Sequence, residues 1–395
     1  MLPEKLNGKH KSFISMSFLA YVALAFPFSV QGSLAPVTME FFTINATQQG
    51  FIMTIQALGA LGAALFIALK GERYNKIHTI AFGLFVIAIV SAGIGFVSAY
   101  AILLIMVVIY GFGNTFIDIM MNGVVSDVYP ARKNTLLPLV HAFFAVGAML
   151  TPWFVTLTAD PADPETFSRP FHFFCIFALA VGVLYLITGR RIKRDTPYLN
   201  MDAMKQRVAE NPAEIFKTKK SWFFLVVGLL YFTFQVGNIM WLPTFTIRNI
   251  GADFSTGGLV LTLFFAGNLV MRFVSPVFFR AMSPRIIYAA FGSIAAVIMI
   301  AALFSPNIGL MFALVIAAGF MQGSSVAAFM LITIDAFPDR TASAASITTF
   351  SSGISTLTAP LWMGALSAYT GFLAPMIIVN CCLLFASILI FFKGK

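Results

Sequence analysis

Long apolar segments recur along the whole chain, and short polar stretches separate them. From Phe13 to Phe392 each apolar segment is close to the ~20 residues that an α-helix needs to cross a hydrocarbon layer of about 30 Å. The pattern therefore predicts an all-α membrane protein. Its twelve predicted transmembrane helices span residues 12–36, 47–69, 76–97, 100–127, 135–158, 170–188, 221–248, 254–280, 284–304, 307–336, 341–368 and 371–392.

Composition and charge distribution agree with this prediction. Only 10% of the 395 residues are charged, against about 25% in ordinary soluble domains. The net charge of +10 does not indicate a nucleic-acid partner, because the basic residues gather between helices on one side. With the N-terminus inside, every Lys and Arg except Arg169, Arg248 and Arg272 falls in a cytoplasmic segment. The positive-inside bias thus predicts a multi-pass cell-membrane protein with both termini cytoplasmic.

The chain divides into two similar halves. A basic polar stretch separates six predicted helices from six, so we predict an N-terminal bundle at residues 1–188, a cytoplasmic linker at 189–220 and a C-terminal bundle at 221–395. A shift of 208 residues aligns the halves without a gap, and the matches mark equivalent ends of predicted helices four and ten. They include Gly111 with Gly319, Asp127 with Asp335, Pro130 with Pro338 and Arg132 with Arg340. Two pseudo-symmetric six-helix bundles are therefore expected.

The duplicated turns at residues 127–132 and 335–340 are candidate gates. Each places an Asp at a helix C-terminus, where a negative charge is unfavourable unless a cation pairs with it. We expect Asp127 and Asp335 each to bridge to an arginine of its own half, with Arg132 and Arg340 as the gating partners. Such bridges would hold a cytoplasmic gate closed. The alternative is two solvated turns at helix ends.

Asp118 is the one carboxylate predicted to lie at bilayer depth. An ionisable side chain at the centre of a transmembrane helix costs about 2.5–3.5 kcal/mol on insertion scales, so it usually serves a function. Asn114 and Asn122 lie four residues to either side and share its helical face. His141 lies at similar depth in the next helix, so we predict that Asp118 and His141 couple proton movement. The alternatives are a fixed ion pair for Asp118, a packing role for His141, and interhelical hydrogen bonds for the two asparagines.

Predicted helix seven carries Gln235, Asn238 and Trp241 at a spacing of three, and Gly237 and Pro243 allow a local break in it. Amide side chains and an indole ring suit a sugar, because amides both donate and accept while an aromatic face covers the apolar side of the ring. The full set of predicted substrate-binding residues is Gln31, Asn114, Asn122, Gln235, Asn238, Trp241, Asn268 and Gln322. Interhelical hydrogen bonding is the alternative for each.

Arg272 points to a different solute. It precedes Arg280 by eight residues in predicted helix eight, so its long side chain is expected to reach the cytoplasmic end. If it faces the interior instead, a carboxylate solute is favoured over a sugar.

Twelve predicted helices, parallel halves, a basic linker and duplicated turns resemble the major facilitator superfamily over essentially the whole chain. Within it, the segment from Gly111 to Asn122 resembles the fucose and glucose/galactose proton symporters, in which helix four carries an acid followed four residues later by Asn. The superfamily's charged motif between helices two and three survives as Lys70-Gly71-Glu72-Arg73 with Lys76. The resemblance implies the major facilitator fold, with solute bound near the midplane between the halves.

The chain lacks a nucleotide-binding Gly-rich loop, a paired-His zinc motif and a nucleophile with an evident base. We therefore predict no enzyme, no cofactor and no metal, and an existing gradient as the energy source. The predicted function is proton-coupled uptake of a small neutral polar solute, such as a monosaccharide, by alternating access. The expected partners are that solute, H⁺ and the lipid bilayer, without nucleic acid, and we expect a monomer. The alternatives are an exporter or carrier of an amphipathic compound or organic acid, and a non-transporting membrane sensor.

Overall fold

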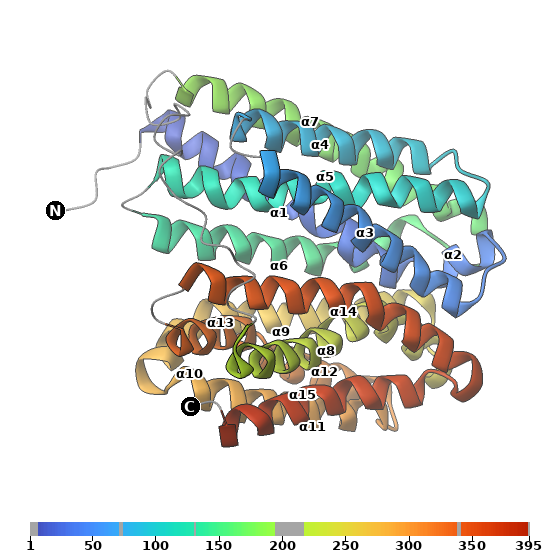
Figure 1. Ribbon diagram of the computed structural model, residues 1–395. Helices are drawn as coiled ribbons and strands as arrows, with labels where there is room; N and C mark the ends of the chain where they lie inside the picture. Colours follow the sequence, from blue (N-terminus) through green and yellow to red (C-terminus); the bar gives the residue numbers. More distant parts are fainter. Residues whose placement is uncertain (1–6, 71–73, 130–131, 194–216, 338–340, 394–395) are drawn as a thin grey trace. The chain divides into compact units, whose positions relative to one another are not determined.

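The computed structural model describes residues 7–70, 74–129, 132–193, 217–337 and 341–393 (Figure 1). Its N-terminal helices are α1 (Gly8–Ser33), α2 (Ala35–Phe41), α3 (Ala46–Lys70), α4 (Lys76–Ile94), α5 (Tyr100–Val128), α6 (Lys133–Thr158), η2 (Pro164–Ser168) and α7 (Arg169–Lys193). The C-terminal helices are α8 (Lys219–Ile250), α9 (Phe254–Ala281), α10 (Pro284–Ile286), η5 (Ile287–Phe291), α11 (Gly292–Leu303), α12 (Ile308–Gln322), α13 (Ser325–Ala336), α14 (Thr341–Thr370) and α15 (Leu373–Lys393).

Eleven helical segments among the described residues are long and apolar enough to cross a membrane. They coincide with eleven of the twelve predicted helices. The twelfth, at residues 341–368, lies in α14, which has 30 residues and is therefore about 45 Å long at 1.5 Å per residue. Its many serines and threonines lower its hydropathy, which explains why it is not among the eleven.

The contacts divide the chain into two compact units. The first unit comprises Met1–Val30, Ile55–Phe154 and Thr158–Val208, and the second comprises Gln31–Thr54, Val155–Leu157 and Ala209–Lys395. Residues 31–54, predicted as part of the N-terminal bundle, thus group with the second unit. Within it, the Thr54 hydroxyl donates to the Leu357 carbonyl oxygen at 2.7 Å. Most of the predicted linker, residues 194–216, lies outside the described residues.

Glycines bring α3 and α5 into backbone contact in the first unit. A methyl group added at Gly59 would overlap the carbonyl oxygen of Val108, and one added at Gly111 would overlap that of Gln56. Only glycine allows helices to approach this closely, because a side chain would hold the backbones apart.

The second unit repeats this crossing with α9 and α12. A methyl group at Gly267 would overlap the carbonyl oxygen of Ile316, and one at Gly319 would overlap that of Phe264. The 208-residue shift carries Gly59 onto Gly267, Val108 onto Ile316, Gly111 onto Gly319 and Gln56 onto Phe264. The sequence repeat therefore preserves one helix crossing in both units.

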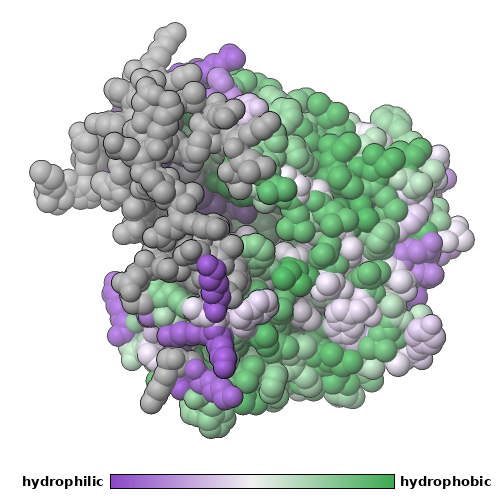
Figure 2. Space-filling model, in the orientation of Figure 1, coloured by the Kyte–Doolittle hydropathy of each residue, from purple (hydrophilic) through white to green (hydrophobic). Residues whose placement is uncertain are grey.

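Large apolar side chains such as Leu65, Ile89 and Val277 lie exposed on the helices. Figure 2 shows hydrophobic residues over much of the visible face. An apolar patch of this extent would be unusual on a soluble monomer, whereas lipid covers it in a membrane.

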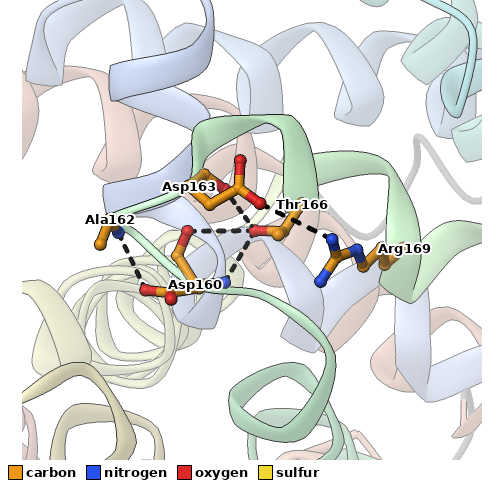
Figure 3. Close-up of polar contacts among 5 residues, drawn as sticks. All are labelled: Asp160, Ala162, Asp163, Thr166 and Arg169. Carbon is orange, nitrogen blue, oxygen red and sulfur yellow. Dashed lines mark hydrogen bonds and ion pairs between the residues drawn. The ribbon is translucent and has the colours of Figure 1, made fainter.

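The loop between α6 and η2 is closed by its own side chains (Figure 3). The Thr166 hydroxyl donates to the Asp160 carbonyl oxygen at 3.0 Å, and Asp163 pairs with Arg169 at 3.6 Å. Both members of this ion pair are more than half exposed, so we assign the loop a structural role only.

Candidate functional site

Asp118 accepts a hydrogen bond from a residue on another helix. The Tyr21 hydroxyl of α1 donates to the carboxylate Oδ1 of Asp118 at 2.9 Å. Tyr21 is 1% exposed, whereas Asp118 is partly buried. The carboxylate therefore lies at the edge of the packed interior of the first unit, with one oxygen oriented by a buried phenol. Sequence reasoning missed Tyr21, although it supplies a hydroxyl in a helix otherwise rich in Phe and Ala.

Asn122 and His141 complete this cluster. The Asn122 side-chain amide donates to the main-chain oxygen of Asp118 at 2.9 Å, and its Oδ1 lies 3.0 Å from Nε2 of His141. The His141 ring also packs edge-on against the Tyr21 ring, with 5.1 Å between centroids. His141 is exposed. The structure thus brings the predicted residues Asp118, Asn122 and His141 together, with Asn122 and Tyr21 between the carboxylate and the imidazole.

Asn114 lies one helical turn before Asp118 on α5. Its side-chain oxygen Oδ1 is buried and has no hydrogen-bond partner among the residues that the structure describes. A buried amide oxygen without a partner costs free energy, so it is suited to accept a hydrogen bond from a bound molecule. The predicted polar stripe on α5 is therefore present, with an unused acceptor at one end.

A second polar cluster lies inside the second unit. Arg272 donates through Nε to the side-chain oxygen of Asn268 at 2.9 Å, and the Asn268 amide donates to Gln322 Oε1 at 2.5 Å. The Gln322 amide in turn donates to the Tyr231 hydroxyl. Two predicted substrate-binding residues, Asn268 and Gln322, thus bond to each other across α9 and α12.

The expectation that Arg272 reaches the cytoplasmic end is wrong. Its bond to Asn268, one turn earlier in α9, directs the side chain back toward the helix N-terminus. Helical Cα–Cβ bonds tilt in that same direction, so reaching Arg280 would require the side chain to double back. Arg272 is partly buried and faces the interior of its unit rather than the end of the helix.

The predicted sugar-binding residues of α8 are mostly engaged in packing. Trp241 is fully buried against Phe372, and its indole donates to the Pro360 carbonyl oxygen at 3.3 Å. Asn238 is fully buried and donates to the Phe234 carbonyl oxygen at 2.8 Å. Gln235 is partly buried. The helix continues through Gly237 and Pro243 without the predicted break.

Gln31, the remaining predicted substrate-binding residue, lies near the end of α1 within the second unit and is 7% exposed. Its main-chain oxygen accepts a hydrogen bond from Gln49 at 3.3 Å. Gln31 therefore groups with the second unit, whereas Asp118 belongs to the first.

Comparison with known proteins decides the family. The family model of the Major Facilitator Superfamily matches residues 17–298. The chain belongs to this superfamily. Its members are transporters rather than enzymes, which agrees with the predicted absence of an enzymatic site.

Individual relatives of this superfamily member are distant. The uncharacterized MFS-type transporter YfkL of Bacillus subtilis (strain 168) is 22% identical over 255 residues, which cover 61% of this chain and 63% of that relative. The matched part is thus less than two thirds of the relative's length.

Solved structures match over nearly the whole chain. A bacterial homologue of the human lysosomal transporter Spinster superposes with a TM-score of 0.81 at 15% identity, covering 99% of this chain and 98% of the other. A D-xylose-proton symporter superposes with a TM-score of 0.79 at 13% identity, covering 98% and 99% respectively. At such low identities these likenesses establish the fold alone.

One predicted gating acid of this superfamily member forms an ion pair. The Asp127 carboxylate accepts a hydrogen bond from Lys76 Nζ at 2.9 Å, so its partner is a lysine of the same half rather than an arginine. The Lys76 side chain is 12% exposed and lies over Gly123 of α5. A methyl group added at Gly123 would contact the end of the lysine side chain. Arg132 is partly buried, Asp335 is exposed and Arg340 lies outside the described residues.

Tyr129 lies within the same turn. Its hydroxyl lies 3.1 Å from the His10 Nδ1 atom of α1. Burial raises the pKa of the Tyr129 phenol well above its ordinary value, so it stays neutral at physiological pH. The turn after α5 is therefore tied to α1 by a hydrogen bond with His10 and to α4 by the ion pair with Lys76.

We expect Lys76→Gln to lower the free energy of unfolding by about 1 kcal/mol, because it leaves Asp127 without its cation at a helix C-terminus. Thermal unfolding in detergent measures this, with the exposed Lys219→Gln as the matched control. The double variant Lys76→Asp with Asp127→Lys should recover part of the loss. In the double variant Lys76→Gln with Asp127→Asn, a loss of free energy of unfolding equal to the sum of the two single losses would show that the ion pair does not stabilise the fold.

Proposed function

We propose that this protein is a proton-coupled secondary transporter that imports a small polar solute, with Asp118 as the proton-carrying group. The observation that carries the proposal is the cluster of Asp118, Tyr21, Asn122 and His141 on three helices of the first unit. A carboxylate within a transmembrane helix, held by a buried phenol and linked through Asn122 and Tyr21 to an exposed imidazole, is suited to bind and release a proton.

Protonation would change the hydrogen bonding of this cluster. An ionised carboxylate only accepts hydrogen bonds, whereas a protonated one also donates. The Tyr21 hydroxyl donates to Oδ1 of Asp118, so a proton on that oxygen would compete with the phenol. Loss of the charge also lowers the cost of enclosing Asp118 in an apolar environment. Proton binding would thereby favour reorientation of the loaded carrier.

The likeness of the segment from Gly111 to Asn122 to the fucose and glucose/galactose symporters supports both proton coupling and a sugar-like solute. The unused side-chain oxygen of Asn114 adds an acceptor for a solute hydroxyl. Trp241 is enclosed by packing, so its ring has no face open for stacking on a solute. A carboxylate-bearing solute is the second candidate, favoured by the inward direction of Arg272.

Two further features belong to this proposal. The ion pair of Lys76 and Asp127 would help to hold a cytoplasmic gate closed. The predominance of Lys and Arg in the predicted inner segments supports cytoplasmic termini. We propose that one chain suffices for transport.

The test is solute uptake by proteoliposomes under an imposed inward proton gradient. Labelled hexoses, a hexuronate, small organic acids and a lipophilic cation form the panel, and an external pH electrode records proton movement on solute addition. Symport predicts accumulation of one solute class, alkalinisation of the medium as it enters, and loss of accumulation when a protonophore removes the gradient. Accumulation that survives the protonophore, or efflux of the cation, contradicts the proposal.

A further inference from the structure

The hydrogen bonds around Arg272 run in one direction. A guanidinium only donates, so the Asn268 side chain must present its oxygen to Arg272 and its amide group to Gln322. Gln322 then presents its amide group to Tyr231. The Tyr231 oxygen therefore accepts a bond from Gln322, which leaves its own hydrogen for an acceptor outside this chain of residues. Arg272 therefore sets which atom donates and which accepts in every hydrogen bond of the cluster.

Three further buried donors lie in the same unit. The hydroxyls of Tyr288, Ser324 and Ser325 are buried, and each is without a hydrogen-bond partner among the described residues. Tyr288 lies on the π-helical segment η5, and its ring centroid is 6.0 Å from that of Tyr231 and 5.8 Å from that of Phe329. Ser325 precedes Phe329 by one helical turn and so shares the face of α13 that Tyr288 approaches.

The helix break beside Arg272 adds a favourable dipole. Predicted helix ten is divided into α12, which ends at Gln322, and α13, which begins at Ser325. A methyl group at Gly323 would overlap the main-chain oxygen of Asn268, so the break lies against α9 one turn before Arg272. The N-cap Ser324 makes no side-chain capping bond. The 12-residue helix α13 thus presents uncapped N–H groups and the positive end of its dipole here.

Donors, a cation and a helix N-terminus together suit an acceptor-rich anion. We propose that Arg272, Tyr231 and the N-terminus of α13 bind the carboxylate of the transported solute, which is therefore a small hydroxylated carboxylate such as a sugar acid or hydroxy acid. A guanidinium matches a carboxylate with two parallel hydrogen bonds. Asn268 and Gln322 act as positioning residues, since they orient Arg272 and Tyr231. This inference rests on the proposed transport function and names its substrate class.

A binding assay on the purified full-length chain tests the inference independently of any gradient. The probes are two pairs that differ chiefly in the carboxylate, glucuronate with glucose and lactate with lactamide, together with inorganic phosphate. Ligand binding raises the thermal unfolding midpoint by mass action, and a titration gives the Kd. We expect a carboxylate probe to bind while its neutral counterpart does not at the same concentration. Equal binding of the members of each pair, or a preference for phosphate, overturns the assignment.

Variants locate the site. Arg272→Gln should weaken carboxylate binding about 10- to 100-fold, because charge-assisted hydrogen bonds are lost. Arg272→Lys should restore part of the affinity, whereas Arg280→Gln on the same helix should leave it unchanged. Gln322→Glu places a carboxylate within the cluster and should also weaken binding, even though the arginine remains. An equal loss in Arg280→Gln, or unchanged affinity in both Arg272→Gln and Gln322→Glu, overturns the site.

The binding assay also separates this inference from the proposed proton coupling. Asp118→Asn should still bind the carboxylate probe in preference to its neutral counterpart while losing gradient-driven accumulation. If accumulation by Asp118→Asn equals that of the wild type while the Arg272 variants still lose affinity, the coupling proposal fails and the carboxylate site stands. If Asp118→Asn loses accumulation but Arg272→Gln binds the carboxylate probe normally, the carboxylate site fails and the coupling proposal stands.

Discussion

Asp118→Asn is expected to reduce proton-driven accumulation to the level of protein-free liposomes while leaving solute exchange across the membrane intact. The amide has nearly the shape of the carboxylate, and its oxygen can still accept the Tyr21 hydrogen bond at the site where 2.9 Å now separates the two atoms. It cannot take up or release a proton. Uptake under an inward proton gradient, compared with counterflow of preloaded solute, measures the two activities in one preparation.

Matched variants define what the Asp118 result means. Asp163→Asn makes the same chemical change at an exposed loop residue of the first unit and should transport normally. Tyr21→Phe removes only the hydroxyl that orients the carboxylate, so it should retain accumulation with an altered pH dependence. Full accumulation by Asp118→Asn, with Asp163→Asn also unchanged, would exclude Asp118 as the proton carrier.

Gly59→Ala is expected to lower the free energy of unfolding by about 1–3 kcal/mol or more, the usual range for overpacking. The added methyl group would overlap the carbonyl oxygen of Val108, and a backbone atom cannot rotate away as a flexible side chain can. α3 and α5 would have to separate. Thermal unfolding of the purified variant in detergent measures the loss, alongside the yield of folded protein.

Gly62→Ala provides a close control, since it lies one turn further along α3 with open space around it. There the alanine should be neutral or stabilising, because alanine is a better helix former than glycine. Gly267→Ala makes the equivalent change in the second unit, against the Ile316 carbonyl oxygen, and should match the loss at Gly59. Similar stabilities for Gly59→Ala and Gly62→Ala would show that the close helix crossing does not constrain the fold.

The sequence alone predicted the local features of this protein. Transmembrane helices can be predicted from the sequence alone, because each needs a continuous apolar segment of sufficient length. The repeat at 208 residues was likewise visible, although the reason for its glycines was not. Gly111 and Gly319 were found as matching residues, and only the structure explains them as the points where α5 and α12 touch neighbouring backbones.

Part of the candidate site could be predicted for the same reason. Asn114, Asp118 and Asn122 follow one another at helical spacing, so their common face follows from the geometry of a single helix. Their neighbours could not be predicted in this way. Tyr21 lies 97 positions from Asp118 in the sequence, and no periodicity links residues on helices so far apart.

The tertiary structure decided which polar side chains pair within the protein. Asn268 bonds to Gln322 and Trp241 bonds to Pro360, 54 and 119 residues away, so both side chains are engaged by partners that local patterns do not reveal. It also decided the direction of Arg272, which could have extended toward either end of α9. Local sequence determines how each helix forms, whereas the packing between helices determines the environment of each polar group.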